Sequence, residues 1–476
     1  METGSLLAGT AQRMITPPVG TPLVGYGSRA AGDLVARYVH DDLWVKALVL
    51  RSGAHSWAIL TADLIGLDAV AVGRIRALVA ARTGLEPHAI LACATHTHAG
   101  PPVCVVAGAV GLADLNAVRS DGTVTACYGQ APSDLRPTAY FAEVIDEAWR
   151  DLLVAESSAA LVEAWVTARE AEVSFGQSEV EGVASSRREQ LSDGSWADPR
   201  REALASATVL SRTKIDPLAR VLAVRDRGSS APLAAVVNYG THPWVFNTSG
   251  VSAELAGAVA DRVAAGWQGS GGSAPVVLYT SGPAGDVTMI WNIDIEKVWR
   301  SRSEESLEAS LSRREQGFDE ELARLGDRLA ACVLSAVANL PLWRSDLLPK
   351  AWRREISLPL KKGYHPPPEL RFAEWQRAAP AGHHLTELQV LALGPWALLA
   401  LPGEPFTSLG RRIRVQSSFE NLLILTVAND YGPVSYMAER ADYEFGGYEL
   451  IVTPAAPEAG EWLVAEATAL LKIAAG

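Results

Sequence analysis

The sequence predicts a mixed α/β fold, in which central mixed β-sheets are flanked by helices and a metal site lies at the strand ends. Two observations support this prediction. Short runs of Val, Leu, Ile and Ala, typical of buried strands, alternate along the chain with longer stretches of helical periodicity. Several of these runs end abruptly in polar residues beside Gly or Pro, and rigid strand ends of this kind position side chains that loops then enclose.

Composition limits the class of protein. The chain has 476 residues, of which 48% are hydrophobic and 20% are charged, as expected for a globular protein with a substantial core. A formal net charge of −12 argues against a nucleic-acid or anionic-membrane partner. The beginning of the sequence lacks the pattern of a signal peptide, and no apolar run is long enough to cross a bilayer. We therefore expect a cytoplasmic protein with reduced cysteines.

In the first half of the chain, residues 52–54 (Ser-Gly-Ala) predict a hairpin between two apolar strands. Gly84 is expected to end a helix, and a Gly- and Ala-rich stretch is expected to form a long loop. The elements expected here are a strand soon after residue 9, strands at 38–51 and 56–63, a helix at 69–82, the loop at 102–136, a helix at 137–159 and a strand at 161–175.

In the second half, an arginine-containing stretch with few apolar residues predicts another long loop, and a highly charged stretch predicts a helix with a solvated face. The elements expected here are the loop at 183–216, strands at 221–224, 233–238 and 276–279, helices at 253–267 and 298–339, a connection at 361–380, two strands within 385–401, a strand at 422–427 and a helix from residue 461.

Residues 91–101, Leu-Ala-Cys-Ala-Thr-His-Thr-His-Ala-Gly-Pro, carry the strongest chemical signal. Side chains along a strand alternate in direction, so His96 and His98 are expected to point to the same side of the strand end. Two imidazoles there suit a divalent metal, or a metal ligand beside a proton donor. The alternative is a solvated polar strand end. Because the chain has only nine histidines, we favour the functional pair.

Other predicted strands end in comparable polar corners, each of which also has an ordinary structural explanation. His242 follows one strand, and alone it would be interpreted as a structural histidine. Glu404 follows another, where a helix N-terminus would favour an acidic residue. Tyr431 follows a third and could be buried packing. A further corner carries Asp286, a natural turn residue, and Thr288.

Seven short motifs occur along the sequence, and several of them contain the polar residues at these strand ends. They are 15–20 (Ile-Thr-Pro-Pro-Val-Gly), 40–43 (His-Asp-Asp-Leu), 94–101 (Ala-Thr-His-Thr-His-Ala-Gly-Pro), 285–287 (Gly-Asp-Val), 403–406 (Gly-Glu-Pro-Phe), 429–431 (Asn-Asp-Tyr) and 446–449 (Gly-Gly-Tyr-Glu). In these motifs, and in their order, the sequence resembles the N-terminal catalytic region of neutral ceramidases and of shorter bacterial proteins that share it. The resemblance spans nearly the whole chain and implies a single catalytic domain over residues 1–476.

The resemblance implies a zinc ion with protein ligands that leave a place for water. The implied metal ligands are His96, His242, Glu404 and Tyr431. The candidate catalytic residues are His98, as proton donor or shuttle, and Thr288. The candidate substrate-binding residues are Arg187, Arg188 and Tyr436, and the candidate supporting residues are Asp286, His40 and Asp63. For the supporting residues, core hydrogen bonding is an equal alternative.

The sequence departs from the family pattern at three places. The family has an active-site serine, assigned as a nucleophile, where this chain has Thr288, which could be nucleophile, substrate ligand or turn residue. The family's second tyrosine is not in register, and Tyr436 matches it only with a two-residue shift. The C-terminal β-sandwich and the secretion signal of the ceramidases have no counterpart in this sequence.

Together these features predict a zinc-dependent amidohydrolase that uses metal-activated water to cleave an N-acyl bond of a small or lipid-like substrate. Two alternatives remain open. The same site could break or form an ester or a lactone, or transfer an acyl group with Thr288 as the acceptor. A protein that keeps the fold only for binding would hold no stoichiometric metal.

Overall fold

The structure is a computed structural model. It describes residues 5–25, 35–104, 106–109, 137–140, 145–191, 196–197, 209–212, 214–244, 249–268, 272–290, 307–364, 366, 370–445 and 447–476. Strands and helices alternate along these residues, and the mixed α/β class is confirmed. The loop predicted at 102–136 lies largely outside them.

An eight-stranded mixed sheet is the largest element of the fold. Its strand order is β16-β14-β13-β8-β1-β3-β4-β5. The strands are β1 (Leu7–Met14), β3 (Trp44–Ser52), β4 (His55–Ala62), β5 (Ile90–Ala94), β8 (Arg169–Glu179), β13 (Leu218–Asp226), β14 (Pro232–Tyr239) and β16 (Val276–Ser281). Only the outermost pairs, β14–β16 and β4–β5, are parallel. Residues that follow β5 and residues that follow β14 therefore leave the sheet from its opposite halves.

A second sheet of four strands packs against the first. Its order is β18-β19-β20-β22, with bounds β18 (Pro349–Pro359), β19 (His383–Leu393), β20 (Trp396–Ala400) and β22 (Asn421–Leu425). Its side chains alternate between two cores, as the strand period requires. Leu391, Leu398 and Leu423 join the core shared with the large sheet. The alternating neighbours Val390, Leu399 and Ile424 join the core on the other face.

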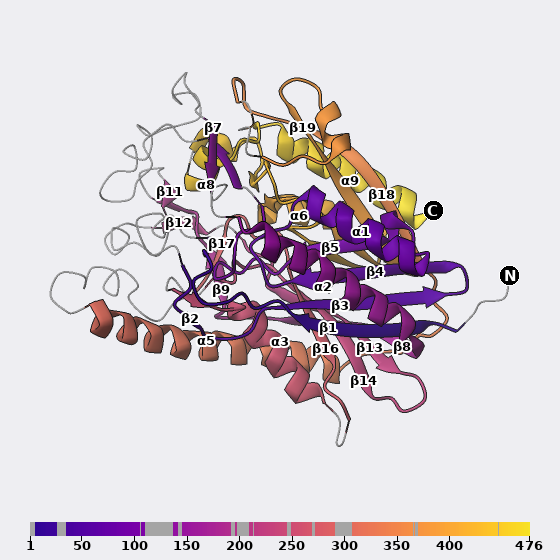
Figure 1. Ribbon diagram of the computed structural model, residues 1–476. Helices are drawn as coiled ribbons and strands as arrows, with labels where there is room; N and C mark the ends of the chain where they lie inside the picture. Colours follow the sequence, from indigo (N-terminus) through magenta and orange to yellow (C-terminus); the bar gives the residue numbers. More distant parts are fainter. Residues whose placement is uncertain are drawn as a thin grey trace.

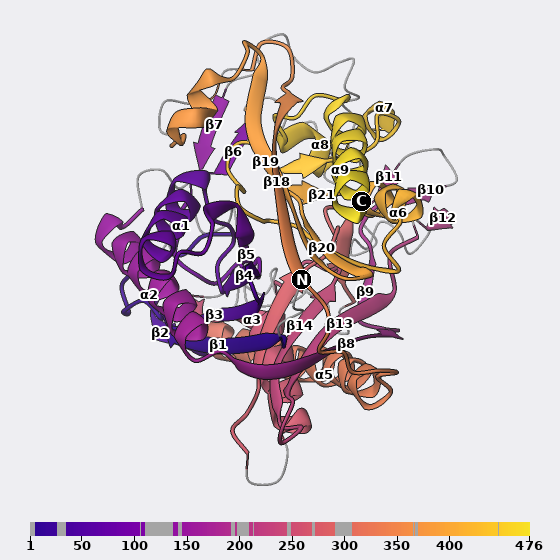
Figure 2. The same cartoon turned by 90° about the vertical axis from the view of Figure 1, so that its right-hand side faces the viewer.

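Helices cover the outer faces of both sheets, so the molecule has four layers: helices, large sheet, small sheet and helices (Figures 1 and 2). Helices α1 (Ala69–Thr83) and α2 (Glu147–Val166) lie beside β1, β3 and β4. Helices α3 (Glu254–Trp267) and α5 (Leu307–Ala338) cover the half of the sheet that contains β13 and β16. Helices α6 (Thr407–Gln416) and α9 (Ala459–Ala475) cover the small sheet.

Short elements connect these layers. They are β2 (Tyr38–Val39), η2 (Pro87–Ala89), β6 (Val106–Ala109), β7 (Pro137–Tyr140), β9 (Ala184–Ser186), β10 (Glu189–Leu191), β11 (Trp196–Ala197), β12 (Val209–Arg212), β15 (Gly250–Val251), β17 (Val287–Met289), η8 (Glu374–Ala378), β21 (Glu404–Pro405), β23 (Tyr436–Met437), α7 (Asp442–Phe445) and α8 (Tyr448–Val452). The prediction of one uninterrupted loop at 183–216 is therefore wrong, because β9 to β12 lie within it.

Local patterns predicted the first hairpin and the first helix correctly. Strands β3 and β4 meet at the expected turn, and α1 ends at Gly84, whose φ of 74° is the left-handed value that glycine adopts without strain. The helix predicted at 137–159 is wrong at both ends. The helix, α2, begins at Glu147, and the Asp146 side chain before it accepts hydrogen bonds from two backbone amides. Its buried face continues to Ala164, so the next strand begins only at Arg169.

The two edges of the large sheet are joined by the segment that follows β22. The Thr426 amide donates to the carbonyl of Ser281 at the end of β16 (2.9 Å). The Ala94 amide of β5 donates to Val427 (3.2 Å), and the Asn429 amide donates to Ala92 (2.7 Å). Residues 426–429 therefore bring the ends of β5, β14 and β16 to one place, although β5 and β16 are the outermost strands of the sheet.

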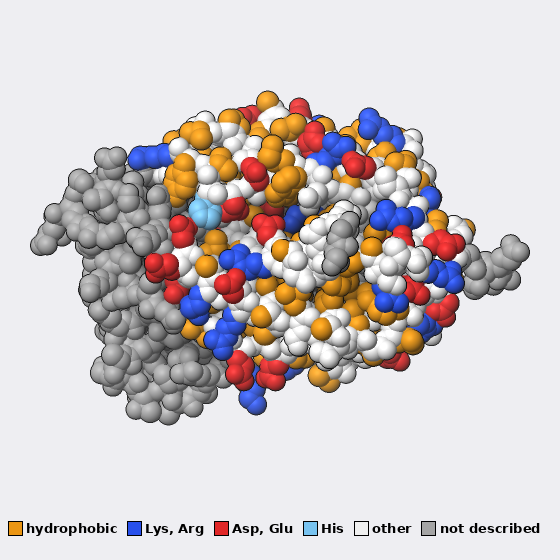
Figure 3. Space-filling model, turned by 90° about the horizontal axis from the view of Figure 1, so that it is seen from below, with side chains coloured by type: hydrophobic (Ala, Val, Ile, Leu, Met, Phe, Trp, Pro, Cys, Tyr) orange, Lys and Arg blue, Asp and Glu red, His pale blue; other side chains and the backbone are white. Residues whose placement is uncertain are grey.

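The surface gives two further facts. On the face seen from below, acidic and basic side chains are interspersed (Figure 3). Within the described part of the chain, no helix combines the length and the apolar character needed to span a bilayer.

Candidate metal centre

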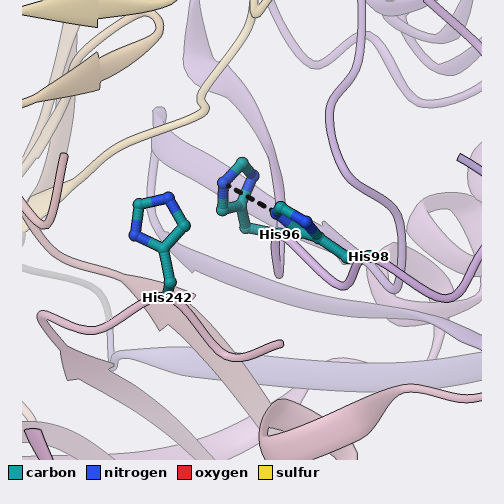
Figure 4. A group of neighbouring side chains, drawn as sticks. All are labelled: His96, His98 and His242. Atoms are coloured by element: carbon teal, nitrogen blue, oxygen red, sulfur yellow. Dashed lines mark hydrogen bonds between the residues drawn. The ribbon is translucent and has the colours of Figure 1, made fainter. Parts of the chain in front are cut away.

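Three histidines meet where the sheet edges are joined. His96 and His98 follow β5, and His242 approaches from the end of β14 (Figure 4). The ring centroid of His96 lies 4.9 Å from that of His98 and 5.1 Å from that of His242. One ring nitrogen from each lies within 4.8 Å of the others, so the group could hold a metal ion.

The outer nitrogen of each imidazole is held by the backbone. Nδ1 lies 2.8 to 2.9 Å from a carbonyl oxygen in all three cases. The acceptors are Ile65 for His96, Gly25 for His98 and Val287 for His242. Because a carbonyl can only accept, Nδ1 must carry the hydrogen, and Nε2 of each neutral ring presents a lone pair. Such bonds fix the tautomer and the orientation of a metal-binding histidine.

A carboxylate and a phenol complete the group. Glu404 Oε2 lies 2.8 Å from His242 Nε2 and 3.3 Å from His96 Nε2. The Tyr431 hydroxyl donates to Glu404 Oε1 (2.7 Å). Glu404 opens β21, and Tyr431 lies beyond the segment that joins the sheet edges. All four side chains are buried.

Burial and mutual proximity separate the pKa values of these groups. Burial opposes ionisation of Glu404, yet the charge of His96 in its protonated form and the close approach of both imidazole Nε2 atoms hold the pKa of Glu404 well below the usual range. Although burial acts against it, the Glu404 carboxylate raises the pKa of His96. Burial, assisted by the Arg187 guanidinium, lowers the pKa of His242 to about 4. Burial and then the neighbouring histidines lower the pKa of His98 well below its usual value.

With all three imidazoles neutral, the atoms that face one another in this group have lone pairs but few hydrogens to donate. Neutral His242 turns the lone pair of Nε2 toward a carboxylate oxygen only 2.8 Å away, because its hydrogen is on Nδ1. The Nε2 atoms of His96 and His98 face each other at 3.4 Å. Such contacts are favourable only if a proton or a cation lies among them. Imidazole nitrogen and carboxylate oxygen are ordinary ligands of a catalytic divalent metal, so the residues present fit one.

The backbone around the centre adopts strained conformations. His96 has φ of 71° and Val427 has φ of 54°, in the left-handed region that non-glycine residues rarely adopt. Gly403, with φ of 57°, precedes Glu404, and a Cβ there would lie 2.1 Å from the carbonyl oxygen of Val434. A Cβ on Gly66 would lie 2.5 Å from the Tyr431 ring. Strain of this kind is typical of functional sites, where the surrounding structure holds side chains in place.

Thr288 lies on β17, directly after the carbonyl that holds His242. Its Oγ1 is buried and has no hydrogen-bond partner among the described residues. A small cavity of about 10 Å³, room for about one water molecule, is lined by His96, His242 and Glu404, but Thr288 is not among its lining residues.

The predicted substrate-binding residues lie next to the centre. Arg187 is buried, its Nε lies 2.7 Å from Glu449 Oε1, and its Nη2 donates to the Gly285 carbonyl (2.5 Å). Its guanidinium lies over the ring of Tyr436, 5.3 Å from the centroid. That ring in turn stacks on His242, with centroids 6.4 Å apart. Arg188 pairs with the same glutamate through Nη1 and Oε2 (3.2 Å) and lies over Phe406.

The three candidate supporting residues have different surroundings. Asp286 accepts hydrogen bonds from the amide and hydroxyl of Thr407 at the start of α6, and the carbonyl that holds His242 belongs to the next residue. Asp63 accepts from the Trp44 amide, and burial raises its pKa to about 6. His40 lies between Asp41 and Asp319, with its side chain about one quarter exposed.

Sequence reasoning missed two residues near the centre. His384 was not among the predicted site residues, but it is buried on β19, where its Nε2 lies 3.0 Å from Asp430 Oδ2, one residue before Tyr431. The strand expected to begin at residue 385 begins at His383, and these two extra residues place His384 on it. Glu254, at the start of α3, contacts the backbone of His98, and nothing in its local sequence indicates this.

Comparisons with known proteins identify the fold. No family model matches the sequence, and no curated protein matches it. The structure is similar to that of neutral ceramidase from Pseudomonas aeruginosa, with a TM-score of 0.70, 15% identity, and coverage of 98% of this chain and 75% of that one. It is also similar to a ceramidase complexed with C2, with a TM-score of 0.67, 14% identity, and coverage of 99% and 75%. The predicted resemblance is confirmed at the level of the fold.

Proposed function

We propose that this chain, which has the fold of neutral ceramidase, is a zinc-dependent hydrolase that cleaves an amide bond of a small or lipid-like N-acyl substrate. The observation that carries the proposal is the contact between His242 Nε2 and Glu404 Oε2 at 2.8 Å, with the imidazole hydrogen committed to Val287. A buried group with so many converging lone pairs is explained most simply by a divalent cation.

In this proposal, His96, His242, Glu404 and Tyr431 hold the metal. The carbonyls that accept from Nδ1 keep both imidazoles in the tautomer that a metal requires. When bound, zinc supplies a Lewis acid that polarises the scissile carbonyl and acidifies a water molecule. Burial and then Glu404 raise the pKa of the Tyr431 hydroxyl, and a cation held beside its oxygen would oppose that shift.

His98 is the proposed proton carrier. Its Nδ1 donates to Gly25, and its lowered pKa leaves Nε2 unprotonated and directed toward His96. In that state Nε2 can take a proton from the attacking water and then give it to the leaving amine. A group that carries a proton in both directions needs a fixed tautomer, and the bond to Gly25 provides one.

Arg187 and Tyr436 are the proposed contacts to the polar part of the substrate. The stack of guanidinium, phenol ring and His242 forms one wall beside the metal ligands. A buried guanidinium can donate to a carbonyl or a carboxylate. We propose N-acyl compounds as the substrate class because the two similar structures are ceramidases, and ceramide is itself one candidate. A cytoplasmic location and a single catalytic domain over residues 1–476 belong to the same proposal.

One observation favours a second candidate function. The buried hydroxyl of Thr288 has no partner among the described residues, and such a group is either strained or reserved for a ligand. If Thr288 accepts an acyl group, the site would cleave or form esters or lactones, or transfer an acyl group. Rapid quenching with substrate followed by peptide mass spectrometry would then find an acyl adduct on Thr288, whereas direct hydrolysis by water leaves none.

The proposed function is tested by metal analysis and a substrate screen. We expect about one zinc per chain in purified protein, and hydrolysis of at least one substrate among N-acyl amino acids, N-acyl sugars and ceramides. His96→Ala and His242→Ala are expected to abolish both. A protein that holds no stoichiometric metal at neutral pH would support the alternative of a binding protein and contradict the enzyme.

A further inference from the structure

Glu254 combines two unfavourable features. Its side chain is completely buried, with an exposed fraction of 0%. Its backbone has φ of 51°, in the left-handed region, at the first residue of α3. A buried carboxylate and a left-handed conformation both lower stability, so their coincidence at one residue indicates a requirement that the surrounding structure enforces.

The carboxylate is directed at the histidine segment. Glu254 Oε2 accepts a hydrogen bond of 2.6 Å from the backbone N–H of His98. The same oxygen lies 2.9 Å from the hydroxyl of Thr97. Hydrogen bonds to an ionised acceptor are shorter and stronger than those between neutral groups. Glu254 thus fixes the backbone at the position where the chain has left β5 and no longer has a neighbouring strand to hold it.

Residues 252 and 253 hold Glu254 itself in position. The Ser252 hydroxyl accepts from the Glu254 amide (2.9 Å) and donates to Asp41 Oδ2 (2.5 Å). The Ala253 amide donates to the other oxygen of the same aspartate (2.7 Å). The strained residue is therefore tied on its N-terminal side to the loop before β3, and its carboxylate cannot move away without breaking this network.

Two separate bonds then determine where the His98 imidazole lies. The bond from Glu254 fixes the backbone nitrogen, and the bond from Nδ1 to Gly25 fixes the ring. Together they direct Nε2 toward His96, 3.4 Å away. A proton carrier that is misplaced by about 1 Å can lose on the order of 100-fold in rate.

We infer that Glu254 is a positioning residue that holds His98 in place for proton transfer, by accepting the hydrogen bond of its backbone amide. The inference rests on the proposed function of His98, but the hydrogen bond on which it depends can be measured without any substrate.

The first experiment measures amide hydrogen exchange in the full-length protein. Glu254→Ala removes the acceptor, and we expect exchange of the His98 amide to accelerate roughly 10-fold or more, with β4 and β14 unchanged. Glu254→Gln keeps a neutral acceptor and is expected to restore most of the protection. Glu172→Ala is the matched control, because Glu172 Oε2 also accepts two hydrogen bonds, from Arg225, on a different strand. Its exchange effect should remain local to β8 and β13.

The second experiment is a double-mutant cycle on the metal-loaded protein. Glu254→Ala should lower kcat by roughly 10- to 100-fold with little change in KM or in metal content. In a His98→Ala background the same substitution should have no further effect on kcat, because the residue acts through His98. Glu254→Gln should recover most, but not all, of the rate. If Glu254→Ala does not fold, the small remaining loss in Glu254→Gln is the expected result in both experiments, and wild-type values in both would contradict the inference.

Three results would overturn the inference. They are unchanged exchange at His98 in Glu254→Ala, a loss of kcat that persists in the His98→Ala background, and an equal loss of kcat in Glu172→Ala. Failure of the proposed function has a different signature, since the wild-type protein would then hydrolyse no substrate while the exchange effect at His98 remained.

Discussion

Two buried polar clusters in this protein resemble each other in composition and differ in what completes them. The histidine cluster consists of His96, His98, His242, Glu404 and Tyr431. The arginine cluster consists of Arg76, Arg353 and Glu387. Each has a buried glutamate at its centre, and in each the pKa of that glutamate lies below its usual range although burial opposes the shift.

The arginine cluster is complete without any addition. Arg76 Nη2 lies 2.7 Å from Glu387 Oε1, Arg76 Nε donates to the Ile90 carbonyl (3.0 Å), and Arg353 also pairs with the glutamate. Guanidinium is permanently charged and carries only donors. The carboxylate therefore keeps its cations at any pH at which the protein is folded, and the cluster serves to connect β19 with α1 and β18.

The histidine cluster is not complete in the same way. The single hydrogen of each neutral imidazole is committed to a carbonyl, so Nε2 can donate to Glu404 only when the ring takes up a second proton, whereas the other cluster has permanent guanidinium donors. A buried carboxylate paired with permanently charged guanidinium groups forms a structural ion pair. A buried carboxylate surrounded by imidazoles, which can be protonated or neutral, can exchange a proton or a metal ion. The contrast leads to five predictions.

The largest expected effect is on metal binding. Glu404→Gln removes the acidic oxygen that contacts the imidazoles of His96 and His242, and we expect it to abolish stoichiometric zinc binding in isothermal titration. Glu387→Gln is the matched control, since it makes the same change in the arginine cluster and should leave stoichiometry at one zinc. Equal loss in both variants would remove the distinction between the clusters.

The next effect is on stability. Arg76→Leu leaves a buried carboxylate with one remaining cation, and we expect it to lower the free energy of unfolding by about 3 kcal/mol in urea titration. Zinc stoichiometry should not change. Adding Glu387→Leu should restore part of the loss, because removing both charges is less costly than isolating one. No recovery in the double variant would show that packing of Arg76, and not its charge, is what stabilises this region.

The third prediction concerns pH. The Glu404 carboxylate raises the pKa of His96 from its ordinary value against the effect of burial, so a metal must displace a proton there over a higher range of pH than from an ordinary histidine. Zinc affinity should therefore fall about tenfold per pH unit as pH drops through and below the raised pKa of His96, with proton release detected by titration in buffers of different ionisation enthalpy. Affinity that does not fall as the pH is lowered would contradict this assignment of the proton.

The arginine cluster should respond to pH in a different range. The pKa of Glu387 is lowered in the folded state, so its contribution to stability is present above about pH 4.5, the unfolded value, and is lost as pH falls through the folded value. Unfolding curves of the metal-free Glu387→Gln variant should thus lose part of their dependence on pH below 4.5 and match the wild-type slope near neutrality.

The smallest expected effect concerns the segment that carries Tyr431. Asp430 Oδ2 lies 3.0 Å from His384 Nε2 and accepts from Gln376 Nε2 (2.8 Å), which ties the residue before Tyr431 to the small sheet. Asp430→Ala should weaken metal binding by about tenfold, as loss of an outer support does. With Cu(II) as a probe, the tyrosinate charge-transfer band should also weaken. An unchanged band would show that Tyr431 keeps its position without this support.

Local patterns in the sequence were sufficient for much of the fold. The hairpin of β3 and β4 and the end of α1 at Gly84 follow from periodicity and turn chemistry, which act over a few residues. His96 and His98 lie close together but beyond the end of β5, and His96 has φ of 71°, so the alternation of a strand is not what brings them together. The boundaries of α2 were predicted poorly, because an apolar helical face and a strand look alike where one follows the other directly.

The meeting of the strand ends depends on contacts that no local pattern contains. Residues 426–429 bond to both edges of the large sheet, through β5 on one side and β16 on the other, and this closure brings His96 to His242 and Glu404. The burial of His384 and the contact of Glu254 with His98 arise in the same way. Backbone hydrogen bonds between segments hundreds of residues apart carry no periodic signal, so residue types could indicate the chemistry while their convergence became visible only in the folded chain.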